Sequence, residues 1–244
     1  MPSHPVAAEL IRSSGVYIAA PSANTSGKPS PTRAEHVIND LSGRIDMIIQ
    51  DDTVDIGVES TIIDLSEEVP TILRPGYITQ AMFEEAIGKT IIDPAIMGSL
   101  KEGVIPKAPG MKYKHYAPNA DVTIVEGPHE KVVQYINRQV SEKEAEGHRC
   151  AVMATDETKD KYICNDIVSA GHKDDELSVA RNLYAILRDF DKQKVEYVYS
   201  ESFETKNVGQ AVMNRLIKAA GHKIVKLDYT FLNNEDMRIS YEHI

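Results

Sequence analysis

The sequence predicts an α/β protein whose C-terminal part contains a mainly parallel sheet covered by helices. Three observations predict this class. Short runs rich in β-branched residues recur after residue 120, and helical patterns separate them. The composition, with 42% hydrophobic and 26% charged residues among 244, is that of a globular protein. Because parallel strands need long crossover connections, alternation of this kind favours a parallel sheet with helices on its faces.

The C-terminal part predicts its elements clearly. Apolar residues at helical spacing predict helices over 174–192, where Asp174 and Asp175 supply a negative N-terminus, and over 208–220. A further helix is expected to bury Val132, Val133, Ile136 and Val140. Short apolar runs predict the strands, which are expected at 121–126, 150–154, 163–170, 195–199 and 224–227. No glycine-rich nucleotide fingerprint follows any of these strands, so the fold alone indicates no function.

The first part of the chain is less regular. Helices are expected over 4–14, 33–41 and 79–87, the last with Thr79 as its N-cap. Strands are expected at 16–20 and 45–49, and extended segments at 60–65 and 71–73. Residues 89–119 carry no convincing periodicity and are interpreted as a connector. The sequence therefore predicts a first domain over 1–88, a connector over 89–119 and a second domain over 120–244.

Charge and cysteine content limit the classes of partner. The net charge is −10, and residues 1–119 and 120–244 each carry −5, which argues against strong direct nucleic-acid binding. The exception is the basic stretch 106–118. Cys150 and Cys164 are too few for a disulfide framework and fit a reducing compartment. The chain has no apolar run long enough for a membrane span and does not open like a signal peptide, so a cytoplasmic location without a membrane partner is expected.

A polar loop follows the strand expected at 16–20. Ser22, Asn24 and Ser30 offer hydrogen-bonding side chains on a loop that also contains Gly27 and three prolines. Loops at the ends of strands are where α/β proteins bind ligands, and such groups suit phosphate oxygens. The alternative is a plain surface turn, because serine, asparagine, glycine and proline dominate turns.

Two shorter segments also carry candidate polar residues. In the segment 57–61, Glu59 needs a partner if it is buried and Ser60 lies at the mouth of a strand; the alternative is a solvated carboxylate. Arg74 lies between an apolar strand and a Pro-Gly turn, which positions a guanidinium for a phosphate; the alternative is a surface salt bridge.

The connector mixes aromatic rings with cations. Residues 109–118 combine tyrosines, a histidine and lysines, a composition that suits stacking on a base and neutralising phosphate, or simply a linker. His115 is a candidate general base. The histidines show no metal-ligand spacing, so no all-protein metal site is expected. The context of Ser60 contains no nucleophile elbow or nearby histidine, which argues against a hydrolase triad.

Taken in order, five motifs resemble the YrdC-like family in its long, two-domain form. They are MPSHP at 1–5, IAAPSANTSGKPSP at 18–31, GVEST at 57–61, ILRPG at 72–76 and PGMKYKHYAP at 109–118. The resemblance covers essentially the whole chain. It implies an incomplete YrdC-like α/β domain followed by a Rossmann-like three-layer α/β/α domain.

The resemblance also implies an activity. Members of the long form condense L-threonine, bicarbonate and ATP to L-threonylcarbamoyl-AMP and pyrophosphate, which serves the threonylcarbamoyl modification of tRNA adenosine 37. Mg²⁺ is expected to accompany ATP without a dedicated protein site. Proteins of tRNA modification are the partners that this activity implies.

Site residues follow from the same resemblance. Ser22 and Asn24 are expected to be catalytic and to bind ATP. The other ATP-binding residues are expected to be Ser30, Arg74 and Tyr113, the last on a lid formed by the connector. Ala20 and Ser60 are expected to bind threonine.

The chain departs from the family in one respect. Family members carry a preceding segment whose lysine and arginine complete the polar set, and this chain begins at the MPSHP motif. The chain alone is therefore expected to be weakly active or inactive, and bare apolar surface is expected to make it self-associate. Two other functions stay open: a non-catalytic RNA-binding or regulatory module on the same fold, and a carbamoyl-transfer domain of the kind used in hydrogenase maturation. The connector and the second domain disfavour the latter.

Overall fold

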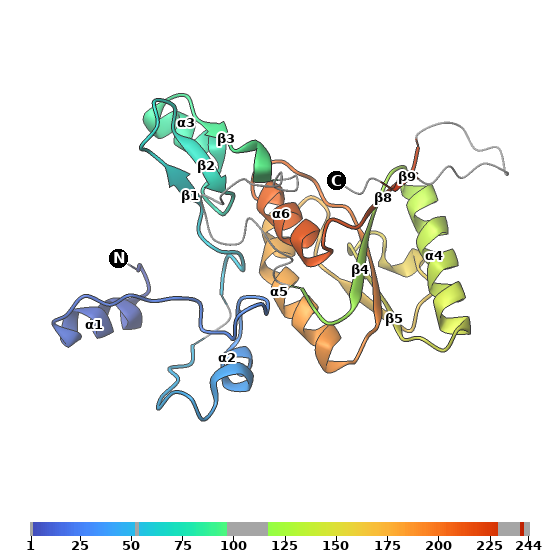
Figure 1. Ribbon diagram of the computed structural model, residues 1–244, viewed down its shortest axis with the longest axis horizontal. Helices are drawn as coiled ribbons and strands as arrows, with labels where there is room; N and C mark the ends of the chain where they lie inside the picture. The colour runs from blue at the N-terminus through green and yellow to red at the C-terminus, as the bar shows by residue number, and fades with distance from the viewer. Residues whose placement is uncertain (1, 52–53, 97–116, 229–239, 242–244) are drawn as a thin grey trace.

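A six-stranded sheet forms the centre of the C-terminal part in the computed structural model, which describes residues 2–51, 54–96, 117–228 and 240–241 (Figure 1). The order of its strands is β6-β5-β7-β4-β8-β9, and all neighbours are parallel except β8 and β9. The strands are β4 (Asp121–Glu126), β5 (Cys150–Ala154), β6 (Asp166–Ser169), β7 (Tyr197–Glu201), β8 (Ile224–Lys226) and β9 (Ser240–Tyr241). The predicted parallel sheet is confirmed.

Helices cover both faces of this sheet. Helix α4 (His129–Ala145) packs on one face, and α5 (Glu176–Lys192) and α6 (Gly209–Ala219) pack on the other (Figure 1). The side chains of β4 point alternately to the two faces of the sheet, so both faces are apolar and need covering. Val122 and Ile124 belong to the core beneath α5 and α6, whereas Val125 belongs to the core beneath α4. The helix-covered sheet expected from the alternating elements, and the three-layer α/β/α arrangement that the resemblance implies, are therefore confirmed.

Helix α5 begins where its capping residue predicts. The carboxylate of Asp175 accepts hydrogen bonds from the backbone N–H groups of Leu177 and Ser178, both at 3.1 Å. Its apolar face, which includes Leu183, Tyr184 and Leu187, is fully buried. A short 3-10 helix, η2 (Lys159–Lys161), connects β5 to β6.

The first part folds into separate small pieces. A three-stranded sheet contains β1 (Ile62–Asp64), β2 (Thr71–Arg74) and β3 (Ile91–Ile92), with β1 antiparallel and β3 parallel to the central β2. Three helices accompany it: α1 (Pro5–Ser14), α2 (Ala34–Leu41) and α3 (Gln80–Ile87). The Thr79 side chain accepts a hydrogen bond from the N–H of Met82, as expected of the N-cap of α3. Figure 1 shows α1 projecting away from the rest, and none of its residues is buried.

Two of the predicted strands are wrong. Residues 16–20 and 45–49 are described without strand structure, and most of their apolar side chains face solvent; Val16 is 64% and Met47 77% exposed. Both segments have the composition of a strand, but among the described residues neither has a neighbouring strand in register. Because β-propensity reflects packing against neighbouring strands, composition alone does not form a strand here.

The expected connector is partly built into the first part. Strand β3 pairs with β2, and a 3-10 helix, η1 (Pro94–Ile96), follows it. The side chain of Asn214 on α6 donates a hydrogen bond to the backbone oxygen of Ile96. Ordered structure therefore continues past residue 88, although the sequence shows no periodicity there. The basic stretch of the connector, with Tyr113 and His115, lies outside the described residues.

Candidate functional site

An open cavity of about 1220 Å³ lies where the loops of the first part meet helix α5. Ser22 and Ser30 of the polar loop line it, together with Glu59 and with Tyr184 from α5. Its other walls come from α1, the segment 49–51 and the segment 54–58. The volume suits a ligand of nucleotide size, and polar groups from distant parts of the chain converge on it.

The buried carboxylate of Asp40 on α2 anchors the polar loop through hydrogen bonds. This carboxylate accepts hydrogen bonds from the backbone N–H of Thr25 at 3.2 Å and from the amine of Lys28 at 3.0 Å. Burial opposes ionisation of Asp40, but the hydrogen bonds from Arg188 and Lys28 outweigh it and hold the pKa of this carboxyl well below its usual range. The carboxylate is therefore charged at neutral pH and fixes the base of the loop.

Helix α5 contributes a second anchor to the same loop. The buried guanidinium of Arg188 donates to the backbone oxygen of Pro29 at 3.0 Å through Nε, and to Asp40 at 2.9 Å through Nη2. One arginine thus joins the loop to α2 and to the C-terminal domain at once. Since the arginine fork is planar and rigid, these contacts fix the orientation of the loop as well as its position.

Glu59 is the centre of a second interdomain cluster. Its carboxylate accepts hydrogen bonds from the hydroxyl of Ser30 at 2.7 Å, from the hydroxyl of Tyr184 at 2.7 Å and from Nε of Arg215 at 3.0 Å. Arg215 is fully buried on α6 and also donates to the backbone oxygen of Pro75. Burial opposes ionisation of Glu59, but Arg215, Tyr184 and Ser30 together lower the pKa of Glu59 to about 2.

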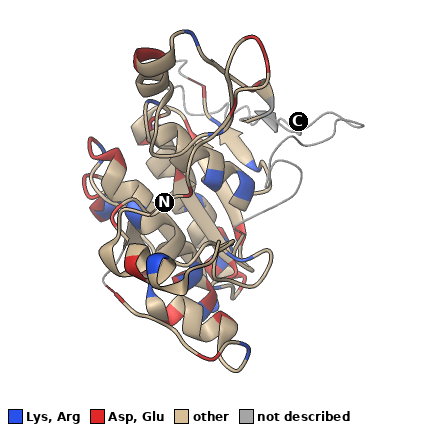
Figure 2. Ribbon diagram, turned by 90° about the vertical axis from the view of Figure 1, so that its left-hand side faces the viewer, with Lys and Arg blue, Asp and Glu red and all other residues tan. Residues whose placement is uncertain are grey.

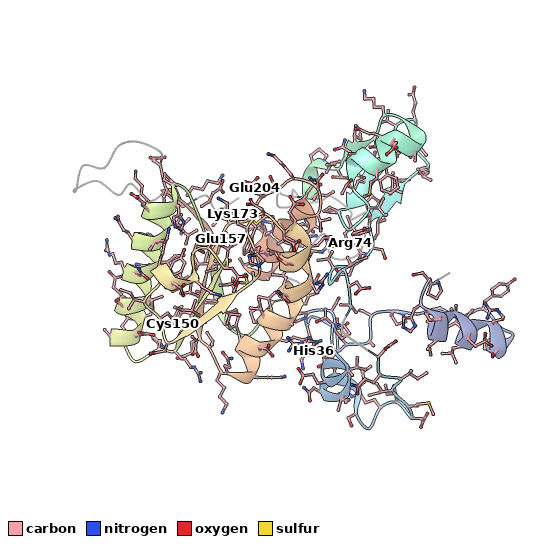
Figure 3. All side chains as sticks on the ribbon, turned by 180° about the vertical axis from the view of Figure 1, so that it is seen from behind. His36, Arg74, Cys150, Glu157, Lys173 and Glu204 are labelled. Atoms are coloured by element: carbon pink, nitrogen blue, oxygen red, sulfur yellow. The ribbon has the colours of Figure 1, made fainter. Side chains whose placement is uncertain are left out.

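Arg74 and Ser60 are brought together outside the wall of this cavity. The guanidinium of Arg74 donates to the backbone oxygen of Ser60 at 3.1 Å through Nε and at 2.9 Å through Nη2. Figure 3 shows Arg74 at the base of the small sheet, on the side that faces the C-terminal domain. The contact orients both residues, and Ser60 follows Glu59 directly in the chain.

The remaining predicted residues differ in their placement. Asn24 turns into its own loop, where its side-chain amide donates to the backbone oxygen of Thr25 at 2.8 Å; its side-chain oxygen is buried and has no hydrogen-bond partner among the described residues. Ala20 is exposed and does not line the cavity. Tyr113 lies outside the described residues. Of the predicted set, the structure thus brings Ser22 and Ser30 into one cavity and pairs Arg74 with Ser60.

Sequence reasoning missed the residues that the C-terminal domain contributes. Tyr184, Arg188 and Arg215 lie on helices that the sequence predicts, but none of them is singled out there as a site residue. The available signal was an arginine at a position that the helical repeat places among apolar residues, as Arg215 is between Val212 and Leu216. A buried arginine requires an acidic partner, and Glu59 was the candidate in need of one.

The ionisation of Glu59 predicts a pH dependence of stability. Its pKa is lower in the folded chain than the ordinary value of 4.5, so its contribution is present above pH 4.5 and is lost as the pH falls towards 2. We expect the free energy of unfolding of the unaltered chain to exceed that of Glu59→Gln at pH 7. This difference should shrink by about 2 kcal/mol between pH 7 and pH 3. Urea unfolding between pH 7 and pH 3 measures it, and a difference that stays constant with pH would contradict the assignment.

The described surface carries both signs of charge. Acidic and basic residues are interspersed over the ribbon in Figure 2, without a basic stripe in that view. No group of three potential metal-ligating side chains occurs within residues 2–51, 54–96, 117–228 and 240–241. In that same part of the chain, no helix is both long and apolar enough to cross a membrane. Cys150 and Cys164 are free thiols.

These features define an α/β protein with a polar cavity where its two interlocked parts meet. Residues 78–221 match the family described as "Threonylcarbamoyl-AMP synthase, C-terminal domain", and residues 1–76 match the family described as "Telomere recombination". The chain belongs to the threonylcarbamoyl-AMP synthase family.

Individual relatives agree with this membership. The chain is 44% identical to the threonylcarbamoyl-AMP synthase of Bacillus subtilis over 93% of its own length and 63% of the relative's. It is 44% identical to that of Pyrococcus abyssi over 93% of its length and 64% of the relative's. The crystal structure of P. abyssi Sua5 complexed with L-threonine superimposes with a TM-score of 0.84 over 93% of this chain and 65% of that one, at 44% identity. The chain thus spans slightly less than two thirds of the length of these relatives.

Proposed function

We propose that this protein forms L-threonylcarbamoyl-AMP and pyrophosphate from L-threonine, bicarbonate and ATP, as a nucleotidyltransferase that serves tRNA modification. The observation that carries the proposal is the convergence of Ser22, Ser30 and Glu59 on one cavity of about 1220 Å³. The names of the relatives and the L-threonine complex of the P. abyssi protein support it.

The reaction mainly requires that the two substrates be held in the right orientation. The amine of threonine takes up the carbon of bicarbonate, with loss of water, to give a carbamate. A carbamate oxygen then attacks the α-phosphorus of ATP, and pyrophosphate leaves. No protein nucleophile is needed, so the chain's task is to align two substrates and to stabilise negative charge. Ser22, whose side chain is exposed in the cavity wall, is the hydroxyl proposed to donate to a phosphate or carbamate oxygen.

The paired residues beside the cavity have separate proposed roles. Arg74, already oriented by the backbone oxygen of Ser60, is proposed to attract the triphosphate, and Ser60 to contact threonine. Asn24 is proposed to act through its buried side-chain oxygen, which has no hydrogen-bond partner in the described part of the chain. Tyr113 and Ala20 keep the roles in ATP and threonine binding that the resemblance implies.

Mg²⁺ is proposed to enter this site as a companion of ATP. Both oxygens of the Glu59 carboxylate are already engaged by Ser30, Tyr184 and Arg215, so this wall of the cavity offers no spare carboxylate ligand. When bound to the triphosphate, Mg²⁺ neutralises part of its charge. The groups of this chain that we propose to contact the triphosphate are the hydroxyl of Ser22 and the guanidinium of Arg74.

Compartment and partners follow from the reaction. The free cysteines fit a reducing compartment, and we propose the cytoplasm. Proteins that transfer the threonylcarbamoyl group to tRNA are the proposed downstream partners. The exposed apolar residues Val16, Tyr17 and Met47 support self-association of this chain.

Release of pyrophosphate tests the proposal. We expect release that requires ATP, L-threonine and bicarbonate together, with threonylcarbamoyl-AMP detected as the product by mass spectrometry. Ser22→Ala should lower the rate at least about tenfold, since it removes a donor from the reacting charges. Ser13→Ala, which removes an exposed hydroxyl on α1 that binds Glu9, is the matched control and should not change the rate. Release without threonine, or no adenylate product, would contradict the proposal.

A further inference from the structure

Among the described residues, the hydroxyl of Ser30 donates to one acceptor, and that acceptor is charged. Oγ of Ser30 lies 2.7 Å from Oε1 of Glu59. A carboxylate that accepts from Arg215 and Tyr184 is ionised and has no proton to give, so the serine must be the donor. The oxygen of Ser30 therefore keeps only its lone pairs for the cavity that it lines.

A hydroxyl that already donates its proton can interact only with a ligand group that donates a hydrogen bond. With its proton committed to Glu59, Ser30 accepts a hydrogen bond from a ligand N–H or O–H and presents no donor to a phosphate oxygen. Ser22 carries no such commitment among the described contacts, so it stays available as a donor. The two serines of one loop thus differ in polarity although their side chains are identical.

The residues that impose this state come from the C-terminal domain. Tyr184 lies on α5 and Arg215 on α6, and they are 125 and 156 residues away from Glu59 in the chain. Glu59 is 17% exposed and Arg215 fully buried, so solvent screens their contact little. Tyr184 and Arg215 both donate to Oε2 of Glu59, which holds the carboxylate in one orientation with Oε1 towards the Ser30 hydroxyl.

We propose that Tyr184 and Arg215 are positioning residues of the substrate cavity, which act through Glu59 to make Ser30 a hydrogen-bond acceptor for a hydroxyl or amine of the substrate. The inference rests on the proposed function and deepens it, because it gives the C-terminal domain a direct part in substrate recognition. The donor belongs either to the nucleoside of ATP or to threonine.

Calorimetric titration of the full chain with ATP, L-threonine and inorganic tripolyphosphate tests the proposal. We expect Ser30→Ala to weaken binding of one donor-bearing substrate about tenfold, and Tyr184→Phe to weaken the same substrate about threefold to tenfold. Whether ATP or threonine is affected identifies the donor. Binding of tripolyphosphate, which has no nucleoside or amine, should not change. The double variant should bind no more weakly than Ser30→Ala alone, because Tyr184 acts only through Ser30.

A matched variant separates positioning from stability. Tyr162 is also a buried tyrosine that donates to a carboxylate, that of Glu201 at 2.5 Å, but it packs beneath α4 on the other face of the sheet. Tyr162→Phe should lower the melting temperature about as much as Tyr184→Phe without changing any of the three affinities. Glu59→Gln provides an independent check, because its carboxamide can donate to Ser30 and reverse the bond; it should weaken the same substrate.

The outcomes distinguish the two proposals. Losses that multiply in the double variant, or an equal loss for tripolyphosphate or for Tyr162→Phe, would overturn the positioning role while leaving the proposed function intact. Binding of neither ATP nor threonine by the unaltered chain would overturn both.

Discussion

Replacing Arg215 with methionine is expected to lower the free energy of unfolding by about 3–5 kcal/mol. Methionine fills a similar volume but leaves the carboxylate of Glu59 buried without its cation and the backbone oxygen of Pro75 without its donor. An uncompensated buried charge is far more costly than the loss of one contact, because water cannot replace the missing partner. Urea unfolding monitored by circular dichroism measures the loss.

An exposed arginine provides the control for this variant. Arg149 is 51% exposed and pairs with Asp166 at 2.8 Å, so Arg149→Met should cost no more than about 1 kcal/mol. The double variant Glu59→Gln/Arg215→Met should lower the free energy of unfolding by less than the sum of the two single variants. A neutral side chain at position 59 no longer needs the cation of Arg215 as its partner. Equal losses for Arg215→Met and Arg149→Met would show that the buried pair does not join the two parts.

The second large effect is expected at Gly57, whose backbone lies directly against the backbone of α5. A Cβ atom at this position would lie 2.3 Å from the Cα of Arg181 and 2.4 Å from the backbone oxygen of Ala180, and φ is +78°. Gly57→Ala should therefore both strain the backbone and push the segment of Glu59 away from α5. We expect a loss of about 3–5 kcal/mol in the free energy of unfolding.

Gly43 separates the two causes. Its φ is +76°, but nothing lies within 4 Å of its Cβ position. Gly43→Ala should cost only the conformational strain, about 1 kcal/mol. Hydrogen exchange should also show faster exchange of the amides around Ser30 and Glu59 in Gly57→Ala but not in Gly43→Ala. Similar losses in the two variants would contradict a close approach of Gly57 to α5.

Local patterns predicted most of the second domain but less of the first. The apolar repeat and capping aspartates of 174–192 predict α5, because a helix that packs on a sheet is specified by its own spacing. The segments 16–20 and 45–49 look equally like strands, yet a strand is completed by a neighbour in register, which their own sequence does not supply.

Only those residues of the candidate site that lie on the loops of the first part could be predicted from the sequence. Ser22, Ser30 and Glu59 were singled out because polar residues cluster at turns and strand ends, and a buried carboxylate needs a partner. Arg215 could not be matched to Glu59, because 156 residues separate them and no local pattern reports which helix packs beneath which loop. The resemblance to a family implies roles for individual residues, but it does not indicate that the Ser30 hydroxyl donates to Glu59.

A crystal structure of this chain with L-threonine and a non-hydrolysable analogue of ATP tests the central claim most directly. We expect the ligands in the cavity between the polar loop and α5, with the Ser22 hydroxyl against an anionic oxygen and the Ser30 oxygen within hydrogen-bond distance of a ligand N–H or O–H. Ligands bound elsewhere on the chain, with Ser22, Ser30 and Glu59 left untouched, would contradict the account.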